Sequence, residues 1–540
     1  MKTECTAKQL EFPGLGRRAV VGQFDGGKIS SDSGGLLLRE VEQRTHMLKR
    51  LAGCFVDHRD ASQIEHAVES LIKQRVMGLA LGYEDLNDHD TLRHDPLLAL
   101  LSDNPDVAGQ RRKRVRDIGC ALAGKSTLNR LELTPLDANE ASRYKKIVAD
   151  ADAIDALLVD LFLEADATPP EEIILDVDAT DDPVHGHQEG RFFHGYDRQY
   201  GYLPLYIFCD EYLLCARLRT ADQDGAVGTT EELARIIAHV RRRWPQTRII
   251  VRGDSGFCRD DLMSWCEAHG VDDVLGLAKN SRLRTAIAAE LAQAKEEDET
   301  TQQAARVFRD FRYQTHTSWA CARRVIGKAE HLAKGENPRF VVTSLSATTH
   351  ATRALYEDLY CARGDMENRI KEQQLGLFAD RTSTREMLSN QLRLYFSSFA
   401  YVLMHTLRRV GLNGTSMAKA QCDTIRVKLF KIGGQIRISV RRIWIAFSDS
   451  DPHAVLFRQI VQRLQRIPLR CSVHAAADPW DGTCIPSERI SLSALPPVVR
   501  NRVHHGTFQH QHTPSHTSST ASKTLPQIYV PHLEQNLNCG

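Results

Sequence analysis

The spacing of apolar residues changes character near residue 165. Residues 63–81 carry apolar side chains at helical intervals, namely Ile64, Val68, Leu71, Ile72, Val76 and Leu79. Residues 151–163 repeat this pattern, and residues 164–172 form a polar joint that contains two prolines. The pattern predicts a mostly helical N-terminal region over 1–165.

Beyond the joint, short apolar runs alternate with helical stripes. Strands are predicted at 173–179, 202–209, 212–218, 248–251 and 274–278, with helices after residue 229 and over 259–269. The order strand, strand, strand, helix, strand, helix, strand is typical of an α/β sheet that is covered by helices. We expect this core to occupy residues 166–281 and 340–412.

Residues 282–339 interrupt the core. They begin with a helical stretch and then alternate as strands, which predicts a mainly β insertion. A buried-strand pattern returns at 340–345, and long helices are predicted at 354–377 and 387–410.

The C-terminal part divides into a basic region, 413–470, and a tail, 471–540, that is rich in His and Pro and is predicted to be disordered. Apolar residues alternate within 424–447 on both sides of Gly433-Gly434, which predicts a β-hairpin. The opposite face of that hairpin would carry four cations, Arg426, Lys428, Arg437 and Arg441.

Composition narrows the class of protein. The chain has 540 residues, of which 42% are hydrophobic and 26% charged, as in soluble globular proteins, and no run is long enough to span a membrane. No secretory signal is visible at the N-terminus, and the 13 cysteines include no C-x-x-C pair. We therefore expect a cytoplasmic protein with reduced thiols.

The net charge of +1 argues against a polybasic nucleic-acid binder only as an average. Residues 401–470 hold 13 Lys and Arg against three acidic residues, a local charge of +10. A second basic cluster extends from Arg111 to Arg116. The segregated charge predicts surfaces for a polyanion.

Three acidic residues are candidates for catalysis. Asp178 ends the apolar run 173–179, Asp254 follows the strand 248–251, and Glu367 lies in the long helix 354–377. Three such carboxylates can hold two Mg²⁺ ions for in-line displacement at phosphorus. Asp176 would face the same side of the strand as Asp178, so it remains an alternative first ligand.

The helix around Glu367 presents Tyr360, Arg363, Glu367 and Lys371 on one face. Such a stripe suits either a solvated helix face or a phosphate clamp.

Several ordered motifs resemble one family. These are Leu175-Asp-Val-Asp-Ala-Thr-Asp-Asp-Pro-Val-His-Gly-His-Gln, Arg252-Gly-Asp-Ser-Gly-Phe, Gly276-Leu-Ala-Lys-Asn and Tyr360-Cys-Ala-Arg-Gly-Asp-Met-Glu-Asn-Arg-Ile-Lys-Glu. Over roughly residues 10–470 the chain resembles the bacterial insertion-sequence DDE transposases of the "IS thirteen-eighty" family, relatives of the group with a Y-R-E-K signature.

The resemblance implies an RNase H-like core in which Asp178, Asp254 and Glu367 form the DDE triad and bind two Mg²⁺ ions, with Mn²⁺ as a substitute. It favours Asp178 over Asp176 because the family pattern Asp-x-Thr is met by Asp178-Ala179-Thr180. The signature lysine is expected at position 374, which is Gln374 here, so Lys371 is the candidate substitute.

The implied reaction is cleavage at terminal inverted repeats, followed by joining of the 3′-OH ends to target DNA. The implied partners are double-stranded DNA and a second copy of the chain in a synaptic dimer. The resemblance also implies a bacterial protein that associates with the nucleoid when bound to DNA, and an N-terminal region, 1–165, that binds DNA or dimerises. Lys279, Asn280, Arg363 and the hairpin cations are candidate phosphate contacts. Trp319 is a candidate platform for a flipped base, with a packed core tryptophan as the alternative.

Two other functions remain open at this point. Residues 119–126 match the P-loop pattern G-x-x-x-x-G-K-[ST], which would make the chain an ATPase acting on DNA. The residues before this motif are too charged for the buried strand that a P-loop requires, and Ser126 is also a plausible helix N-cap. A DNA-binding protein that has lost catalysis is the second alternative.

Overall fold

A computed structural model describes residues 9–166, 168–195 and 198–468. The predicted disordered tail lies outside these residues. No helix in the described ranges is long and apolar enough to cross a membrane.

The N-terminal region is mainly helical, but it begins with strands that the sequence pattern did not predict. β1 (Gln9–Leu15) and β2 (Arg18–Gln23) form an exposed antiparallel hairpin, and β3 (Lys28–Ser30) pairs with β18 (Gly434–Ile438). The helices that follow are α1 (Leu36–Thr45), α2 (Met47–Ala52), α3 (Val68–Leu81), α4 (His89–Leu92), α5 (Pro96–Leu101), α6 (Lys125–Glu132) and α7 (Ala151–Leu163). Short 3-10 turns lie at η1 (Ser33–Gly35), η2 (Ala61–Gln63), η3 (Leu86–Asp88) and η4 (Val115–Asp117), and β4 (Phe55–Asp57) pairs with β5 (Ile147–Ala149).

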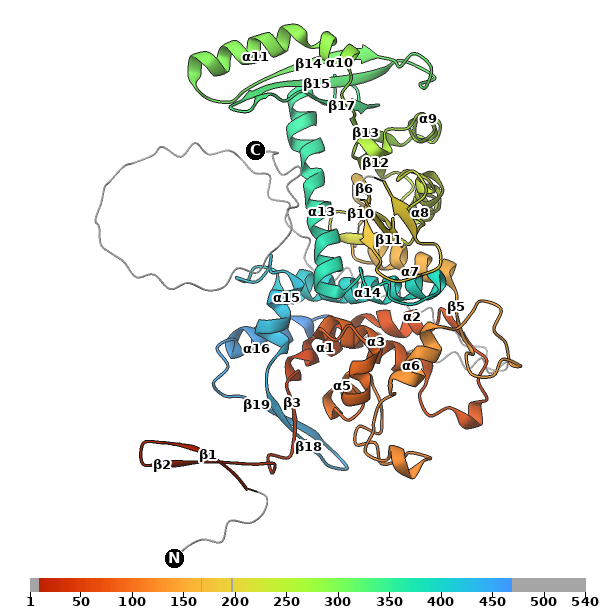
Figure 1. The fold of residues 1–540 in the computed structure, drawn as a ribbon, viewed down its shortest axis with the longest axis vertical. Helices are drawn as coiled ribbons and strands as arrows, with labels where there is room; N and C mark the ends of the chain where they lie inside the picture. The colour runs from red at the N-terminus through yellow and green to blue at the C-terminus, as the bar shows by residue number, and fades with distance from the viewer. Residues whose placement is uncertain (1–8, 167, 196–197, 469–540) are drawn as a thin grey trace, which may run out of the picture. The chain divides into compact units, whose positions relative to one another are not determined.

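These helices share a hydrophobic core with α14 (Met387–Leu407), which is buried along most of its length. Figure 1 shows α14 lying across the N-terminal helices. The core also takes in side chains of α16 (Ala454–Leu464), so segments from both ends of the described chain stabilise one another.

A central mixed sheet follows, with the strand order β11-β10-β6-β12-β13-β17-β15-β14. Its strands are β6 (Glu172–Ala179), β10 (Leu205–Cys209), β11 (Tyr212–Arg217), β12 (Arg248–Gly253), β13 (Asp272–Leu277), β14 (Ala305–Tyr313), β15 (Arg323–Leu332) and β17 (Arg339–Thr343), with β16 (Gly335–Glu336) paired to β15. β6, β12 and β13 run parallel, and the other pairs are antiparallel. The predicted α/β sheet is therefore present.

Helices cover the central sheet, as its two-faced pattern requires. On one face, Leu175 and Val177 of β6 pack in a core that includes side chains of α8 (Thr229–Arg243) and α9 (Asp260–Ala268). The alternate residues Asp176 and Asp178 point to the other face, because successive side chains of a strand do so. Beside β6, β7 (Asp182–Pro183), β8 (Phe192–His194) and β9 (Gln199–Tyr202) make a small separate sheet.

The segment predicted as a β insertion starts with two helices, α10 (Ser281–Ala286) and α11 (Ala288–Thr301). Its strands β14 and β15 do not form a sheet of their own. They join the central sheet through β17, which pairs with β13 on one side and with β15 on the other.

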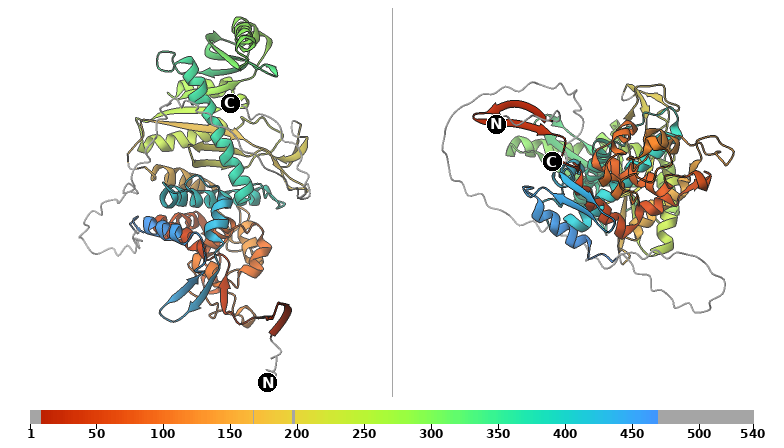
Figure 2. Two further views of the ribbon diagram at one scale, coloured as in Figure 1. Left: turned by 90° about the vertical axis from the view of Figure 1, so that its left-hand side faces the viewer. Right: turned by 90° about the horizontal axis from the view of Figure 1, so that it is seen from below.

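A long helical run follows the sheet and is visible in Figure 1 and in the left view of Figure 2. It consists of α12 (Thr352–Ala354), the π-helical turn η6 (Leu355–Tyr360), η7 (Cys361–Arg363), α13 (Gly364–Lys371) and a second π-helical turn, η8 (Glu372–Gly376). The prediction of a helix over 354–377 is confirmed, and the π-helical turns change its side-chain register locally.

The hairpin predicted over 424–447 is only half correct. Residues 422–430 are helical, as α15 (Cys422–Ile425) and the π-helical turn η10 (Arg426–Phe430), which come after the π-helical turn η9 (Arg408–Leu412). The hairpin consists instead of β18 and β19 (Ile443–Phe447) and turns after Ile438. Ile425 and Leu429 lie four residues apart and are buried, so a helical spacing was also present in the alternation.

Candidate active site

The carboxyl ends of two parallel strands bring Asp178 and Asp254 together. In the register of β6 and β12, Val177 lies opposite Gly253, and each aspartate is the next residue along its own strand. Asp254 also accepts a hydrogen bond from the amide of Gly256 at 2.8 Å, which fixes the turn η5 (Ser255–Phe257) after the strand. The sheet register therefore places both carboxylates at one edge.

Glu367 reaches the same edge from α13. Arg363, one turn earlier in the helical run, donates a 2.6 Å hydrogen bond to Oε1 of Glu367 and lies 3.4 Å from Oδ2 of Asp178. The Arg363 guanidinium thus bridges the two acids, and both the helix and β6 contribute to one cluster. Burial by itself lowers the pKa of the Arg363 guanidinium. The charges of the two bridged carboxylates act in the opposite direction, and the pKa lies above its usual value.

The charges that act on Asp178 come from Arg363 and from the two other acids. The pKa of Asp178 is raised to about 7, mainly by burial; Arg363 acts to lower it, and the charges of Asp254 and Glu367 act to raise it. Like charges at this proximity resist simultaneous ionisation unless a cation compensates them. Asp178, Asp254 and Glu367 thus form an acidic cluster in which the carboxylates outnumber the neighbouring cation, Arg363.

The donor set suits a hard divalent cation, since carboxylate oxygens are its preferred ligands. Nevertheless, no three metal-binding side chains in the described ranges stand close enough together to hold one ion. In the structure, the guanidinium of Arg363 contacts both Asp178 and Glu367. The three acids fit a metal in the chemistry of their oxygens.

Asp176 has a different role in the structure. Its two oxygens accept hydrogen bonds from Nε and Nη2 of Arg252 at 2.5 and 2.7 Å, and both side chains are buried. Arg252 also donates to the carbonyl of Leu359 in η6, near the start of the helical run. Sequence reasoning did not identify this pair, although Arg252 belongs to one of the quoted motifs.

Gly276 allows Tyr360 to approach the site. A Cβ atom at Gly276 would lie 2.5 Å from the Tyr360 hydroxyl and 2.8 Å from the amide nitrogen of Ser255, next to Asp254. The missing side chain therefore lets β13, the Asp254 turn and Tyr360 pack against one another. The glycine was part of a quoted motif, but its steric role depends on three elements that only the fold brings together.

The other predicted contact residues differ in accessibility. Lys279, Lys371, Lys428, Arg437 and Arg441 are exposed. Asn280 caps α10 by accepting a hydrogen bond from the amide of Leu283 at 2.9 Å, and its side-chain amide donates to Tyr313.

Trp319 and Arg426 are buried, in contrast to the exposed positions that their predicted roles require. Trp319 is 7% exposed and packs edge-to-face on Tyr313, so the packed alternative describes it as it stands. Arg426 donates to the backbone carbonyls of Ala80 and Gly376 and pairs with Asp423. Both side chains make contacts within the protein interior and are turned away from solvent.

The P-loop alternative lacks its structural context. Lys125 opens α6 after irregular chain and the short turn η4, and no strand precedes the motif between residues 102 and 124. Lys125 pairs with Asp90 at 3.3 Å and donates to Asn87. Without a strand before the loop, its amides are not arranged to hold a phosphate.

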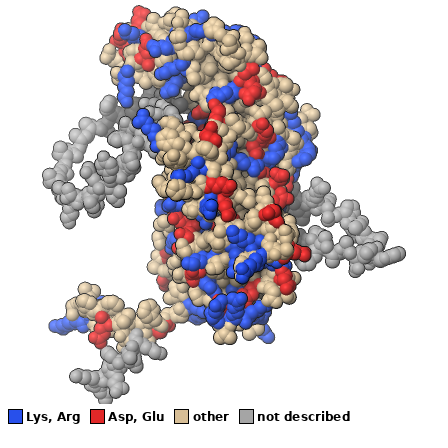
Figure 3. All heavy atoms as spheres, turned by 45° about the vertical axis from the view of Figure 1, so that its right-hand side comes forward, with Lys and Arg blue, Asp and Glu red and all other residues tan. Residues whose placement is uncertain are grey.

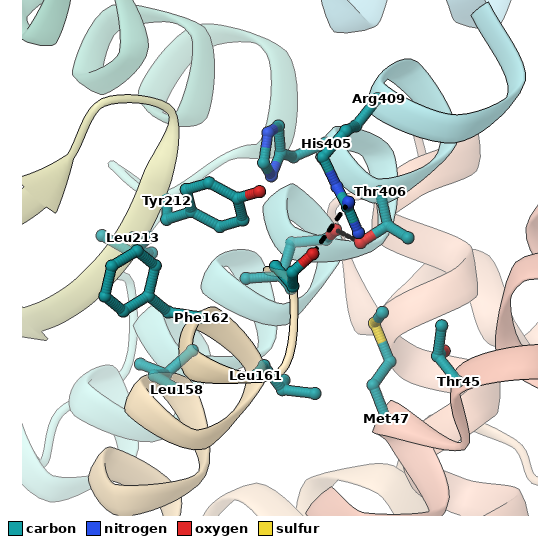
Figure 4. A pocket seen from close by; sticks show the side chains of 12 residues that line it. Thr45, Met47, Leu158, Leu161, Phe162, Tyr212, Leu213, His405, Thr406 and Arg409 are labelled. Atoms are coloured by element: carbon teal, nitrogen blue, oxygen red, sulfur yellow. Dashed lines mark hydrogen bonds between the residues drawn. The ribbon is translucent and has the colours of Figure 1, made fainter. Parts of the chain in front are cut away.

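A small cavity elsewhere in the fold does not belong to the acidic cluster. Figure 4 shows it between α7, β11 and α14, lined mainly by apolar side chains. Its volume of about 30 Å³ is enough for a water molecule only. Arg409 crosses its wall and donates to the carbonyl of Ala165.

The fold and the site define an α/β protein with an acidic cluster at the carboxyl edge of its sheet. Residues 12–469 match the family described as "Transposase DDE domain group 1", and the chain therefore belongs to this family of DDE transposases. No curated protein matches the sequence.

Among solved structures, the chain is similar to a piggyBac transposase in a synaptic complex with hairpin DNA, determined by cryo-EM. The two chains are 12% identical with a TM-score of 0.34, and the match covers 82% of this chain and 87% of the other.

Proposed function

We propose that this DDE transposase binds the terminal inverted repeats of an insertion sequence, cleaves the element ends and joins the 3′-OH ends to target DNA. The observation that carries the proposal is the meeting of Asp178, Asp254 and Glu367 at one sheet edge, where their charges act on the pKa of Asp178. The assignment to the "IS thirteen-eighty" family rests on the quoted motifs.

The strand order supports an RNase H-like core. β6, β10 and β11 are the first three strands of the core, β12 and β13 are the next two, and their order in the sheet is third, second, first, fourth, fifth. Only the second of these strands runs antiparallel to the others. Asp178 and Asp254 then stand on the adjacent first and fourth strands.

In the proposed mechanism, Asp178, Asp254 and Glu367 would hold Mg²⁺ or Mn²⁺. Bound there, two such ions would supply a nucleophile at neutral pH and stabilise the leaving oxygen. Water first attacks the phosphorus at the element end, and the P–O3′ bond breaks to leave a 3′-OH. That hydroxyl then loses its proton, attacks a target phosphodiester in line and displaces a target 3′-oxygen.

The cations beside the acids would position the DNA. Arg363 presents a planar donor pair that matches a phosphate, and its release from Glu367 and Asp178 would free it for that contact. The exposed Lys279 and Lys371 and the hairpin cations Arg437 and Arg441 would contact the backbone further away. A homodimer would hold the two element ends together.

The proposal is tested with purified protein, Mg²⁺ and a duplex that carries the inverted repeat flanking its gene. We expect 3′-end cleavage and joining of that end to a plasmid, both lost in Asp254→Asn. Equal activity of Asp254→Asn and wild type would sink the proposal. Specific DNA binding without any cleavage by the wild type would favour the alternative of an inactive DNA-binding protein.

A further inference from the structure

The segment between α5 and α6 carries an unusual density of cations that the proposed catalytic machinery does not use. Five of the six residues 111–116 are Arg or Lys. We call residues 110–118 the basic loop. It lies in the N-terminal helical region and includes the turn η4.

The basic loop is held in place by its backbone. Carboxylate oxygens of Asp106 accept hydrogen bonds from the amides of Gln110 at 3.0 Å and Arg111 at 2.6 Å. The amide of Lys113 donates to Glu65 at 3.0 Å, and the guanidinium of Arg112 lies 2.6 Å from Nε2 of His66. The side chains of two of the loop's five cations are thus engaged in fixing its conformation, because Lys113 also donates from its ammonium group to the carbonyl of Ser62.

The other three arginines are left for solvent. Arg111, Arg114 and Arg116 are exposed, and the first two have no acidic partner within the described ranges. Arg116 is 74% exposed and lies 3.9 Å from Asp117, whose other oxygen is already bound by Arg93 at 2.8 Å. Figure 3 shows Lys and Arg side chains gathered on the lower part of one face of the molecule.

An apolar residue stands between two of these arginines. Val115 is 85% exposed, although burying an apolar side chain of this size usually stabilises a protein by about 1.5 kcal/mol or more. Ile118, at the end of the loop, is 47% exposed. A fixed loop that presents arginines around an exposed apolar tip matches the way proteins enter the minor groove of duplex DNA.

We propose that the basic loop contacts duplex DNA, with Arg114 and Arg116 on the phosphates that border a minor groove and Val115 at the groove. This inference deepens the proposed function and rests on it, because it names a DNA contact outside the acidic cluster and the hairpin. A purely acidic protein partner would satisfy the arginines, but it would leave the exposed Val115 unexplained.

The test measures the binding of full-length protein to a fluorescent 40-base-pair duplex between 50 and 300 mM salt. Affinity falls as salt rises, and each lost phosphate contact makes the slope of log affinity against log salt shallower by about 0.9. The variant R114Q/R116Q should therefore make it shallower by about 1.8. The matched control is R242Q/R243Q, which removes two exposed arginines of α8 and should leave the slope unchanged. Circular dichroism confirms that each variant is folded.

A second variant addresses the apolar tip. V115S keeps all charges, so we expect an unchanged salt slope but a smaller preference for an A·T-rich duplex over a G·C-rich one. The inference falls if R114Q/R116Q matches its control in both affinity and slope while the wild type binds. If the wild type binds no duplex at all, the proposed function fails as well, so the two failures are distinguishable.

Discussion

β6 carries two aspartates on one face, and each faces an arginine, yet the two pairs differ in kind. Asp176 and Arg252 form a buried, two-pronged ion pair at 2.5 and 2.7 Å. Two residues later, Asp178 makes a longer contact of 3.4 Å with Arg363, and that arginine lies closer to Glu367. The charges of Asp176 and Arg252, the inner pair, balance each other. Asp178, the outer acid, instead shares the single cation Arg363 with two other carboxylates nearby.

The comparison shows that residue types alone do not distinguish a structural acid from a candidate ligand. Both aspartates are on the same strand face, and burial raises the pKa of both. What differs is the surrounding charge, because only Asp178 lies at the strand end where Asp254 and Glu367 add repulsion. The position of Asp178 is therefore distinguished by having more acidic than basic side chains around it.

The largest expected effect is on catalysis by the outer acids. Asp254→Asn and Asp178→Asn should each lower the rate of end cleavage by at least about 10³-fold while the fold is retained. A cleavage assay on a labelled duplex, with circular dichroism as a folding control, measures this. Nearly full activity of both variants would remove the distinction between the two positions.

Asp176→Asn should instead affect stability. It leaves the Arg252 guanidinium buried without its countercharge, which typically costs about 3–5 kcal/mol. Urea unfolding measures the loss, and the control is D181N at an exposed position on the same segment. If Asp176→Asn unfolded like wild type but abolished cleavage, the inner aspartate would be the catalytic one.

Gly276→Ala should disturb the outer site alone. The added methyl group would stand 2.5 Å from the Tyr360 hydroxyl and 3.1 Å from the carbonyl carbon of Asp254, so one of them must shift. We expect a loss of roughly 1–3 kcal/mol in stability, and a loss of cleavage of about 10²-fold from a displacement near 1 Å. Gly270→Ala, where no atom lies within 4 Å, controls for an added methyl group, although its positive φ brings some strain.

The smallest expected effect, when it is taken over a single pH unit, is on stability and concerns a third buried acid. Asp182 is 1% exposed, and burial raises the pKa of its carboxyl group to about 8, although the neighbouring Thr382 side chain acts to lower it. The folded state therefore retains a proton that the unfolded chain releases near pH 4, so stability falls between pH 4 and 8, by up to about 1.4 kcal/mol per unit. Asp182→Asn should flatten this dependence in unfolding measured at several pH values. An unchanged slope would show that Asp182 is not the group responsible.

Much of the core was predictable because its signals are local. The apolar run that ends in Asp178 and the helical spacing around Glu367 depend on neighbouring residues, and both elements are present. The hairpin over 424–447 was half wrong because Ile425 and Leu429 fit a helix as well as a strand, and packing against the N-terminal core decides between them.

Other features depend on contacts between distant segments. The burial of Arg426 comes from carbonyls of residues 80 and 376, and the insertion strands join the central sheet through β17. Likewise, the bridging position of Arg363 requires β6 and the helical run to meet, although they are 185 residues apart. Sequence spacing carries no signal for such encounters.

The guanidinium between Asp178 and Glu367 has a consequence for ion uptake. Under the proposed function, a dication that entered there would exchange with a positive group already in place, so the local charge would rise by one unit if Arg363 left, and by two if Arg363 stayed nearby. The observed affinity would then be the intrinsic affinity reduced by the equilibrium constant for releasing Arg363. A phosphate that receives the released arginine favours that exchange, and the binding of DNA and of metal would reinforce each other through one side chain.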